Sequence, residues 1–392
     1  MDMEVFVTGL GAISCLGDGP EAFWKGLQAG RSSPTPVESL AGHVRAPLAY
    51  QVPPGTDASA HAEDDATWGR ASRFALHAAR QAVVDAGLTD EEVAGMAVVI
   101  ATAIGMCEER EDAFRAGVPD DAVWTSSFSV ASAVGGALGS FGANISVSNA
   151  CAASGYALSV AMDLIRRGEA ETVLVGGAEG SAGVPIAAFN RLGAIDPDGC
   201  RPFEADRKGT VFGEGAAMLV VQSARAAARR RSYGRLSGTA WSCDAYHTTA
   251  PDPGRRQWLR AAREAMRDAG CGPETIGCVI PHGTGTQQND LLESETLREV
   301  LGQQCDTTPL FSLKAYIGHT AGAAAAFSAV SAALVLWHGQ VPPNIALARQ
   351  DPACDVWLPQ GGPTPLPRPG VLINSYAFGG SNVSLVLDGG VP

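Results

Sequence analysis

The sequence has little positive charge and very little lysine. Its 392 residues contain 28 Lys and Arg against 41 Asp and Glu, which gives a net charge of −13. Proteins that bind nucleic acid need a basic face to neutralise phosphates, so this balance argues against that function. Only three lysines occur, Lys25, Lys208 and Lys314. A lysine kept in an apolar segment, as Lys314 is, stands out among so many arginines.

The sequence also has few signs of paired cysteines, of a leader segment or of a membrane span, and we expect none of the three. The nine cysteines are odd in number and widely spaced, without a CxxC pair or a Cys/His cluster, which argues against a disulfide framework and a metal site. Residues 1–7 resemble a strand rather than a signal peptide. The longest apolar run, 321–337, is short for a bilayer span and rich in Ala and Ser. We therefore expect a cytoplasmic protein, no membrane contact and a buried helix at this run.

Apolar strands and helices are what the chain has in abundance. Its hydrophobic share is 46%, enough for one large or two ordinary globular domains. Helical spacing over 71–86 predicts a helix, and the continuous apolar run 97–102 predicts a strand covered on both faces. The polar, proline-bearing stretch 31–68 predicts a surface excursion.

Two later units share one plan. In the first, a strand at 143–149 leads to Cys151 and a helix that runs to residue 165. In the second, a strand at 310–314 leads to His319 and the Ala-rich helix. Two such units suggest a duplicated α/β architecture with a site between its halves, at the carboxyl ends of strands. Chance similarity of two βα units is the alternative.

Cys151 is the first candidate for chemistry. It lies between a strand and a helix that begins with small residues, and a helix N-terminus favours the thiolate, which is the nucleophilic form. An inert buried thiol is the alternative, because a lone Cys among alanines is more often structural.

Three downstream segments supply polar side chains in glycine-rich turns. The first is HGTGT with His282, followed by Asp290 and Glu293. The second runs from Lys314 to His319. The third is FGGSN, which begins at Phe378 and Gly379.

The order of Cys151, HGTGT, KxxxGHTxGA and FGGSN resembles the β-ketoacyl-acyl carrier protein synthases, of the elongating type with a Cys-His-His site. The similarity covers nearly the whole chain, from the opening VTGLGAIS to the closing glycine loop, with RPF and GEG between them. It implies a thiolase-like α/β fold with a duplicated five-layered α-β-α-β-α architecture. We expect an N-terminal half, 1–235, with the nucleophilic cysteine, and a C-terminal half, 236–392, with both catalytic histidines.

The resemblance also implies the reaction. Cys151 would hold an acyl chain as a thioester and condense it with malonyl-acyl carrier protein, with loss of CO2 and extension by two carbons. His282 and His319 would stabilise the enolate, and the backbone N–H groups of Cys151 and Phe378 would form the oxyanion hole. Both substrates arrive on the phosphopantetheine of an acyl carrier protein, so no further cofactor is expected.

Supporting roles follow for the remaining polar residues. Lys314 would orient the histidine side of the site, with a purely structural salt bridge as the alternative. Asp290 and Glu293 would fix the loops that carry Lys314 and His319. Phe378 beside Gly379 resembles the family's gate, or is a packing ring. Two further residues resemble those of a neighbouring active-site loop, Asp244 and His247.

Some segments depart from the family pattern. The stretch 102–130, which shapes the acyl tunnel in this family, is shortened and contains Trp124, so chain length stays open. Residues 196–198 are acidic where relatives carry a basic contact for the carrier protein. Docking would then use other arginines: Arg70 and Arg73, or the run Arg229, Arg230 and Arg231.

The strand at 143–149 resembles the family strand that pairs across a twofold axis, which predicts a dimer. The mate is either an identical chain or a related subunit that sets chain length. The Arg and Ala content fits type II polyketide synthesis, a polyene among the candidate products, with fatty-acid synthesis as the other pathway.

Cys151, His319 and the Gly9-Leu10-Gly11 turn argue against three other functions. A chain-length-setting partner with little catalysis of its own would normally lack the nucleophile, which Cys151 supplies. A thiolase or an initiating synthase would carry Cys-His-Cys or Cys-His-Asn in place of His319. The Gly9-Leu10-Gly11 turn is too incomplete a fingerprint for a Rossmann dehydrogenase.

Overall fold

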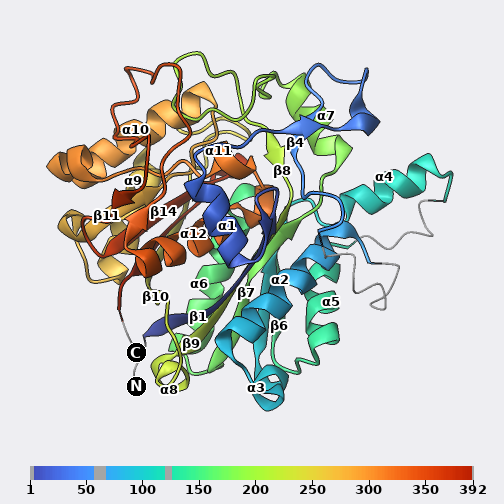
Figure 1. Cartoon of the computed structure of the whole chain (residues 1–392), viewed down its shortest axis with the longest axis vertical. Coiled ribbons are helices and arrows are strands. Elements are labelled where there is room, and N and C mark those ends of the chain that lie inside the picture. Colours follow the sequence, from blue (N-terminus) through green and yellow to red (C-terminus); the bar gives the residue numbers. More distant parts are fainter. Residues whose placement is uncertain (1–3, 57–67, 120–125, 391–392) are drawn as a thin grey trace.

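A mixed β-sheet forms the centre of the protein. The computed structural model describes residues 4–56, 68–119 and 126–390 (Figure 1). The strand order of the sheet is β11 (Ile276–Ile280), β14 (Gly370–Tyr376), β15 (Ser381–Asp388), β10 (Gly234–Cys243), β1 (Val5–Ser14), β9 (Gly215–Ser223), β7 (Thr172–Glu179), β5 (Ala97–Ala101) and β6 (Asn144–Val147), and β2 (Gly17–Asp18) pairs with β1. Strand β6 is therefore an edge.

The two halves of this sheet repeat one pairing pattern. From β1 to β6, the successive pairs are antiparallel, antiparallel, parallel and parallel. From β10 through β15 and β14 to β11, they are antiparallel, antiparallel and parallel, and Leu310 adds a parallel bridge to Val279 of β11. Strands β1 and β10 join the halves through short antiparallel pairing. The duplication predicted from the two βα units is confirmed.

The predicted strand at 310–314 is wrong beyond Leu310. The N–H of Ser312 donates to the Asn344 side chain at 2.8 Å, and the N–H of Leu313 donates to the Phe311 carbonyl. These bonds turn the chain instead of extending a ladder. Lys314 consequently begins the short helix α11 (Lys314–Ile317).

The two half-sheets and three helix layers make up the expected five layers (Figure 1). One helix layer lies between the half-sheets, and the other two lie on their outer sides. Helices α2 (Arg70–Ala86) and α5 (Ser129–Leu138) cover the outer face of the N-terminal half-sheet. Helices α9 (Arg256–Asp268) and α10 (Gln287–Leu301) lie on the outer side of the C-terminal half. Helices α6 (Ala153–Arg166) and α12 (Ala324–His338) lie between the halves and contact strands of both.

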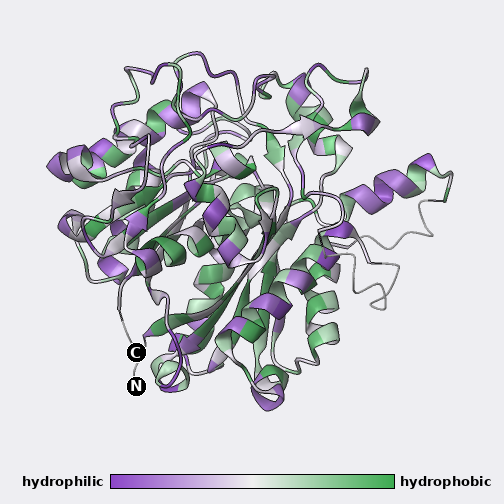
Figure 2. Ribbon diagram, viewed as in Figure 1, coloured by the Kyte–Doolittle hydropathy of each residue, from purple (hydrophilic) through white to green (hydrophobic). Residues whose placement is uncertain are grey.

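The middle layer explains the long apolar run. Residues 321–338 are the one described stretch long and apolar enough to cross a bilayer by length and composition, and 83% of it is buried inside the protein. Figure 2 shows hydrophobic residues along the central elements and hydrophilic residues on the outer helices. Small side chains are needed in this layer, because a Cβ on Gly155 of α6 would lie 2.3 Å from the Val383 side chain.

The remaining helices and strands lie outside the central layers or connect them. The predicted surface excursion at 31–68 is only partly right, because Tyr50 in β4 (Leu48–Tyr50) is buried and β4 pairs with β8 (Phe212–Gly213). Residues 57–67 of that stretch lie outside the described residues. The other helices and strands are α1 (Pro20–Gln28), α3 (Asp90–Gly95), α4 (Cys107–Arg115), α7 (Gly183–Arg191), α8 (Ala224–Ala227), β3 (Thr35–Pro36), β12 (Gln340–Val341) and β13 (Thr364–Pro365). The proposed boundary between the halves, at 235 and 236, falls at the start of β10.

Candidate active site

Cys151 lies on a strained turn that leads into the middle layer. It is part of a single 3-10 turn, Ala150–Ala152, between β6 and α6. Ala150 has a φ of 46°, a left-handed conformation that a non-glycine residue rarely adopts. The Cys151 carbonyl accepts a hydrogen bond from the Ser375 hydroxyl at 3.0 Å. Ala321, at the start of the corresponding turn before α12, has a φ of 41°.

The surroundings of Cys151 keep its sulfur protonated at rest. Burial raises the pKa of the thiol to about 11, and the charge of Glu179 adds to this effect. The charge of Lys314 and the backbone N–H groups of Phe378 and Cys151 lower that pKa only in part. The Cys151 N–H group, at the start of the helix, therefore acts in the expected direction, but desolvation outweighs it. The N–H groups of Phe378 and Cys151 nevertheless both act on the Cys151 sulfur.

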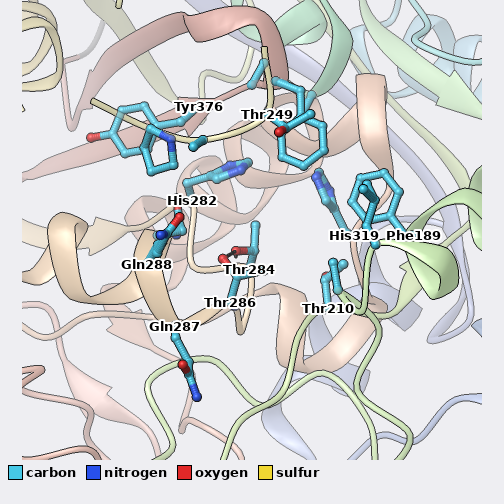
Figure 3. Close-up of a pocket in the computed structure, with 18 of the residues that line it drawn as sticks. Phe189, Thr210, Thr249, His282, Thr284, Thr286, Gln287, Gln288, His319 and Tyr376 are labelled. Carbon is cyan, nitrogen blue, oxygen red and sulfur yellow. Dashed lines mark hydrogen bonds between the residues drawn. The ribbon is translucent and has the colours of Figure 1, made fainter. Parts of the chain in front are cut away.

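His282 and His319 face each other across one cavity (Figure 3). His282 follows β11, and His319 follows α11. Their ring centroids are 5.4 Å apart, with the planes at 85°. Burial, and then the charge of Lys314, holds the pKa of both imidazoles well below 6.5. Both rings are consequently neutral at pH 7, and each can donate one N–H.

Lys314 connects the two histidine turns. Its ammonium group donates to the His282 carbonyl oxygen and lies 3.4 Å from the Nδ1 atom of the same residue. A charged ammonium can only donate, so Nδ1 accepts and the ring proton of His282 belongs on Nε2. Burial lowers the pKa of Lys314, and the charge of Glu293 opposes that shift.

Asp290 and Glu293 hold the His282 turn. Glu293 accepts the backbone N–H of His282 at 2.7 Å and that of Gly283 at 2.8 Å. Asp290 accepts the N–H of Gly285 at 3.2 Å. Asp290 also accepts the N–H of Phe203 at 2.9 Å. Both acids were expected to fix the Lys314 and His319 loops. Their backbone hydrogen bonds go to the loop after β11 and to Phe203, since both acids lie on the first turns of α10, and Glu293 acts on Lys314 through its charge.

Arg207 is a support that the sequence analysis missed. Its guanidinium is almost fully buried and lies 3.1 Å from Asp290 and 2.7 Å from Asp351. A buried arginine between two carboxylates fixes the position of Asp290. Arg207 lies four residues after the RPF motif, and no local pattern there distinguishes a buried arginine from an exposed one.

Phe378 lies at the entrance to the site, 39% exposed. Its ring stacks on Phe189 of α7 with centroids 5.2 Å apart, and Gly379 beside it has a φ of 85°, which favours glycine. The N–H of Gly379 donates to the Thr248 carbonyl at 2.8 Å. Two loops therefore meet at this aromatic ring.

Asp244 and His247 belong to the second of these loops. Asn382 donates to the Asp244 carboxylate at 2.7 Å, which ties the loop to FGGSN. The Nδ1 atom of His247 accepts N–H groups of Thr249 and Ala250, both at 3.1 Å. Both residues line the cavity.

The cavity has a volume of about 670 Å³ and brings together Cys151, His282, His319 and Phe378. Seven other lining residues were not assigned from the sequence: Phe189, Leu192, Lys208, Thr210, Trp258, Gln288 and Tyr376. Gln288 and Tyr376 lie close to the HGTGT and FGGSN motifs, which could have indicated them. Trp258 stacks on Tyr376 with centroids 3.8 Å apart and forms one wall. The ring of Phe212 lies parallel to His319 and edge-on to Phe189.

The arginines expected to dock the carrier protein do not line the cavity. Arg70 bonds to the buried carboxylate of Glu214, with its Nε 2.9 Å from Oε2. Arg73 is exposed on α2. In the arginine run, Arg230 pairs with Glu92 and Arg231 pairs with Asp85.

The acidic stretch 196–198 also has internal partners. Asp196 is buried and accepts from Arg201, and Asp198 pairs with Lys208 at 3.1 Å. Its acidity is thus partly neutralised within the chain. Trp124 lies outside the described residues.

Comparison with known proteins gives the same family over both halves. Family models match residues 2–227, described as Beta-ketoacyl synthase, N-terminal domain, and residues 233–348, described as Beta-ketoacyl synthase, C-terminal domain. The chain is 32% identical over 404 residues to the 3-oxoacyl-(acyl-carrier-protein) synthase 2 of Synechocystis sp., with 97% of each chain covered.

Two solved structures extend the comparison. The ishigamide ketosynthase/chain length factor has a TM-score of 0.90 and 34% identity over 98% of each chain. A type II polyketide synthase acyl-carrier protein in complex with its ketosynthase bound to the hexaketide has a TM-score of 0.88 and 28% identity over 99% of each chain. The chain therefore belongs to the β-ketoacyl synthase family of condensing acyltransferases.

Proposed function

We propose that Cys151, His282 and His319 catalyse a decarboxylative Claisen condensation between an acyl thioester and malonyl-acyl carrier protein. The observation that carries this proposal is the meeting of one cysteine and two neutral imidazoles in a single cavity. A thiol accepts an acyl group as a thioester, and two N–H donors stabilise an enolate oxygen.

In the first half-reaction, the Cys151 sulfur attacks the acyl carbon and the carrier thiol leaves with the proton. The tetrahedral oxyanion is stabilised by the backbone N–H groups of Cys151 and Phe378. Their convergence on the thiol supports this role. Because the resting group is a thiol, its proton must leave as the carbon–sulfur bond forms.

In the second half-reaction, the bond between the malonyl α-carbon and its carboxylate breaks and CO2 leaves. The electron pair of that bond stays on the thioester and forms an enolate. The Nε2–H of His282, directed by Lys314, and an N–H of His319 donate to the enolate oxygen. The enolate carbon then attacks the acyl-Cys151 carbonyl, and the Cys151 thiolate leaves and regains a proton. Phe378 would move to admit each substrate in turn, with Gly379 as its hinge.

The test uses purified chain, malonyl-acyl carrier protein and acyl primers of graded length. Cys151→Ala should abolish condensation yet retain release of CO2, because the histidine side is intact. His319→Ala should lose CO2 release and still accept an acyl group on Cys151. Condensation that persists in Cys151→Ala would sink the mechanism.

Partners and pathway follow from the relatives. A related ketosynthase has been solved with its acyl-carrier protein, which supports such a carrier as the partner here. Arg73 is the better docking candidate, because the Arg70 side chain is already bonded to Glu214. The likeness to a ketosynthase/chain length factor pair supports polyketide synthesis in a heterodimer. Fatty-acid synthesis in a homodimer is the other candidate. We place the protein in the cytoplasm.

A chain-length-setting partner subunit is the second candidate function, because one solved relative contains such a factor. The presence of Cys151 on its strained turn argues against it. Graded primers, offered with and without a related subunit, separate the two: a partner subunit would change product length without holding an acyl group.

A further inference from the structure

Glu179, at the end of β7, has no role in the mechanism above, yet its carboxylate is fully buried. Among the described residues, its hydrogen-bond partners carry no charge. Its oxygens accept the Thr102 hydroxyl at 3.0 Å, the Ile104 N–H at 3.2 Å, the Gly322 N–H at 2.9 Å and the Ala103 N–H. A buried carboxylate costs free energy unless such donors satisfy it.

These donors come from both halves of the protein. Thr102, Ala103 and Ile104 follow β5 in the N-terminal half, whereas Gly322 belongs to the turn that follows His319. A Cβ on Gly322 would lie 2.4 Å from the Ala103 nitrogen and 2.6 Å from Glu179 Oε1. The two halves therefore meet here backbone to backbone, with the carboxylate as the common acceptor.

The same carboxylate acts on Cys151 through its charge. Burial raises the pKa of Glu179 to about 7, against the pull of its four donors. The charged form raises the pKa of the Cys151 thiol, whereas Lys314 lowers it. His282 and His319, which also face the cavity, are neutral.

We infer that Glu179 is a positioning residue that fixes the His319 turn against the half that carries Cys151. This inference rests on the proposed function. An amide at this position offers one acceptor oxygen, and its NH2 group would face backbone N–H donors. Loss of the carboxylate should therefore loosen the His319 turn. It should also remove a negative charge that disfavours the Cys151 thiolate.

The test compares Glu179→Gln with Glu171→Gln, a half-exposed carboxylate before β7 that pairs with Arg225. Two readouts are needed: release of CO2 from malonyl-acyl carrier protein, and alkylation of Cys151 by iodoacetamide against pH, followed by peptide mass spectrometry. Glu179→Gln should lower kcat for CO2 release roughly tenfold to hundredfold, since small displacements of a catalytic group have such effects. The alkylation midpoint should move to lower pH, which mere loosening would not cause. Glu171→Gln should match the wild type.

Thr102→Val serves as a milder variant should Glu179→Gln fail to fold. It removes one donor to the carboxylate, so CO2 release should fall by a smaller factor. A folded Glu179→Gln with wild-type CO2 release or an unmoved alkylation profile would overturn the inference. A wild-type protein without CO2 release would instead overturn the proposed function, so the two failures are distinguishable.

Discussion

At the scale of single residues, the site depends on one buried positive charge. Lys314 lowers the pKa of Cys151, of His282 and of His319, and it contacts Nδ1 of His282. The same charge thus favours the thiolate of the proposed nucleophile and keeps the two proposed enolate donors neutral. Among three lysines in the chain, this one has an electrostatic reason for its place.

Replacing Lys314 should move two pH dependences in the same direction. In Lys314→Met, His282 no longer faces a cation, so its pKa rises and acid loss of CO2 release begins at a higher pH. The pKa of Cys151 also rises, so iodoacetamide alkylation requires a higher pH than in the wild type. The pH profiles of both reactions measure this.

Lys25→Met is the matched control, because Lys25 is an exposed lysine of α1 that pairs with Glu21. Its profiles should superimpose on those of the wild type. If acid loss of CO2 release in Lys314→Met begins at the same pH as in the wild type, or at a lower pH, the assigned role of the charge is contradicted.

At the scale of elements, the middle helices are held close by small residues. Helix α6 approaches β15 at Gly155, where an added methyl would lie 2.3 Å from Val383 Cγ1 and 3.4 Å from the Ala325 Cβ. Because α6 begins at the Cys151 turn and α12 follows the His319 turn, their separation sets the geometry of the site.

Gly155→Ala tests this close approach. An alanine within a helix normally stabilises by about 1 kcal/mol relative to glycine, but overpacking a dense core costs about 1–3 kcal/mol. We expect the second effect to win and the free energy of unfolding to fall. Urea unfolding followed by circular dichroism measures it.

Gly136→Ala in α5 is the control, since its added methyl would meet nothing within 4 Å. It should raise the free energy of unfolding by up to about 1 kcal/mol. Equal stabilisation of both variants would show that α6 and β15 are not in close contact.

At the scale of the whole molecule, β6 leaves one edge of the sheet open. It pairs only with β5 among the described strands, and its residues are partly exposed. An unpaired edge is a natural place for a second chain to add.

This edge predicts a dimer. Two identical chains would have twice the 40.3 kDa mass of the chain, and a dimer with a related subunit would have the sum of the two subunit masses. Native mass spectrometry of the chain alone and after co-expression with a related subunit decides between them. A monomer under both conditions would contradict the prediction.

The sequence predicts the parts of the site that carry local signals. Cys151, His282 and His319 each lie in a short turn rich in small residues, so chain order and motif identify them. Glu179 and Gly322 are 143 residues apart, and Phe189 reaches Phe378 only in the folded chain. Contacts of this kind depend on how the halves meet, which no local pattern encodes. The predicted strand at 310–314 is wrong beyond Leu310 for a different reason: the Ser312 N–H donates to the side chain of Asn344, which lies in the same half of the chain but 32 residues away.

Location of the acyl group tests the central claim most directly. The purified chain is incubated with an acyl-acyl carrier protein, and its intact mass and peptide map are recorded beside those of Cys151→Ala. The account predicts one acyl group per chain, on Cys151, and none in the variant. An acyl group on another residue, or an equal adduct in Cys151→Ala, would contradict it.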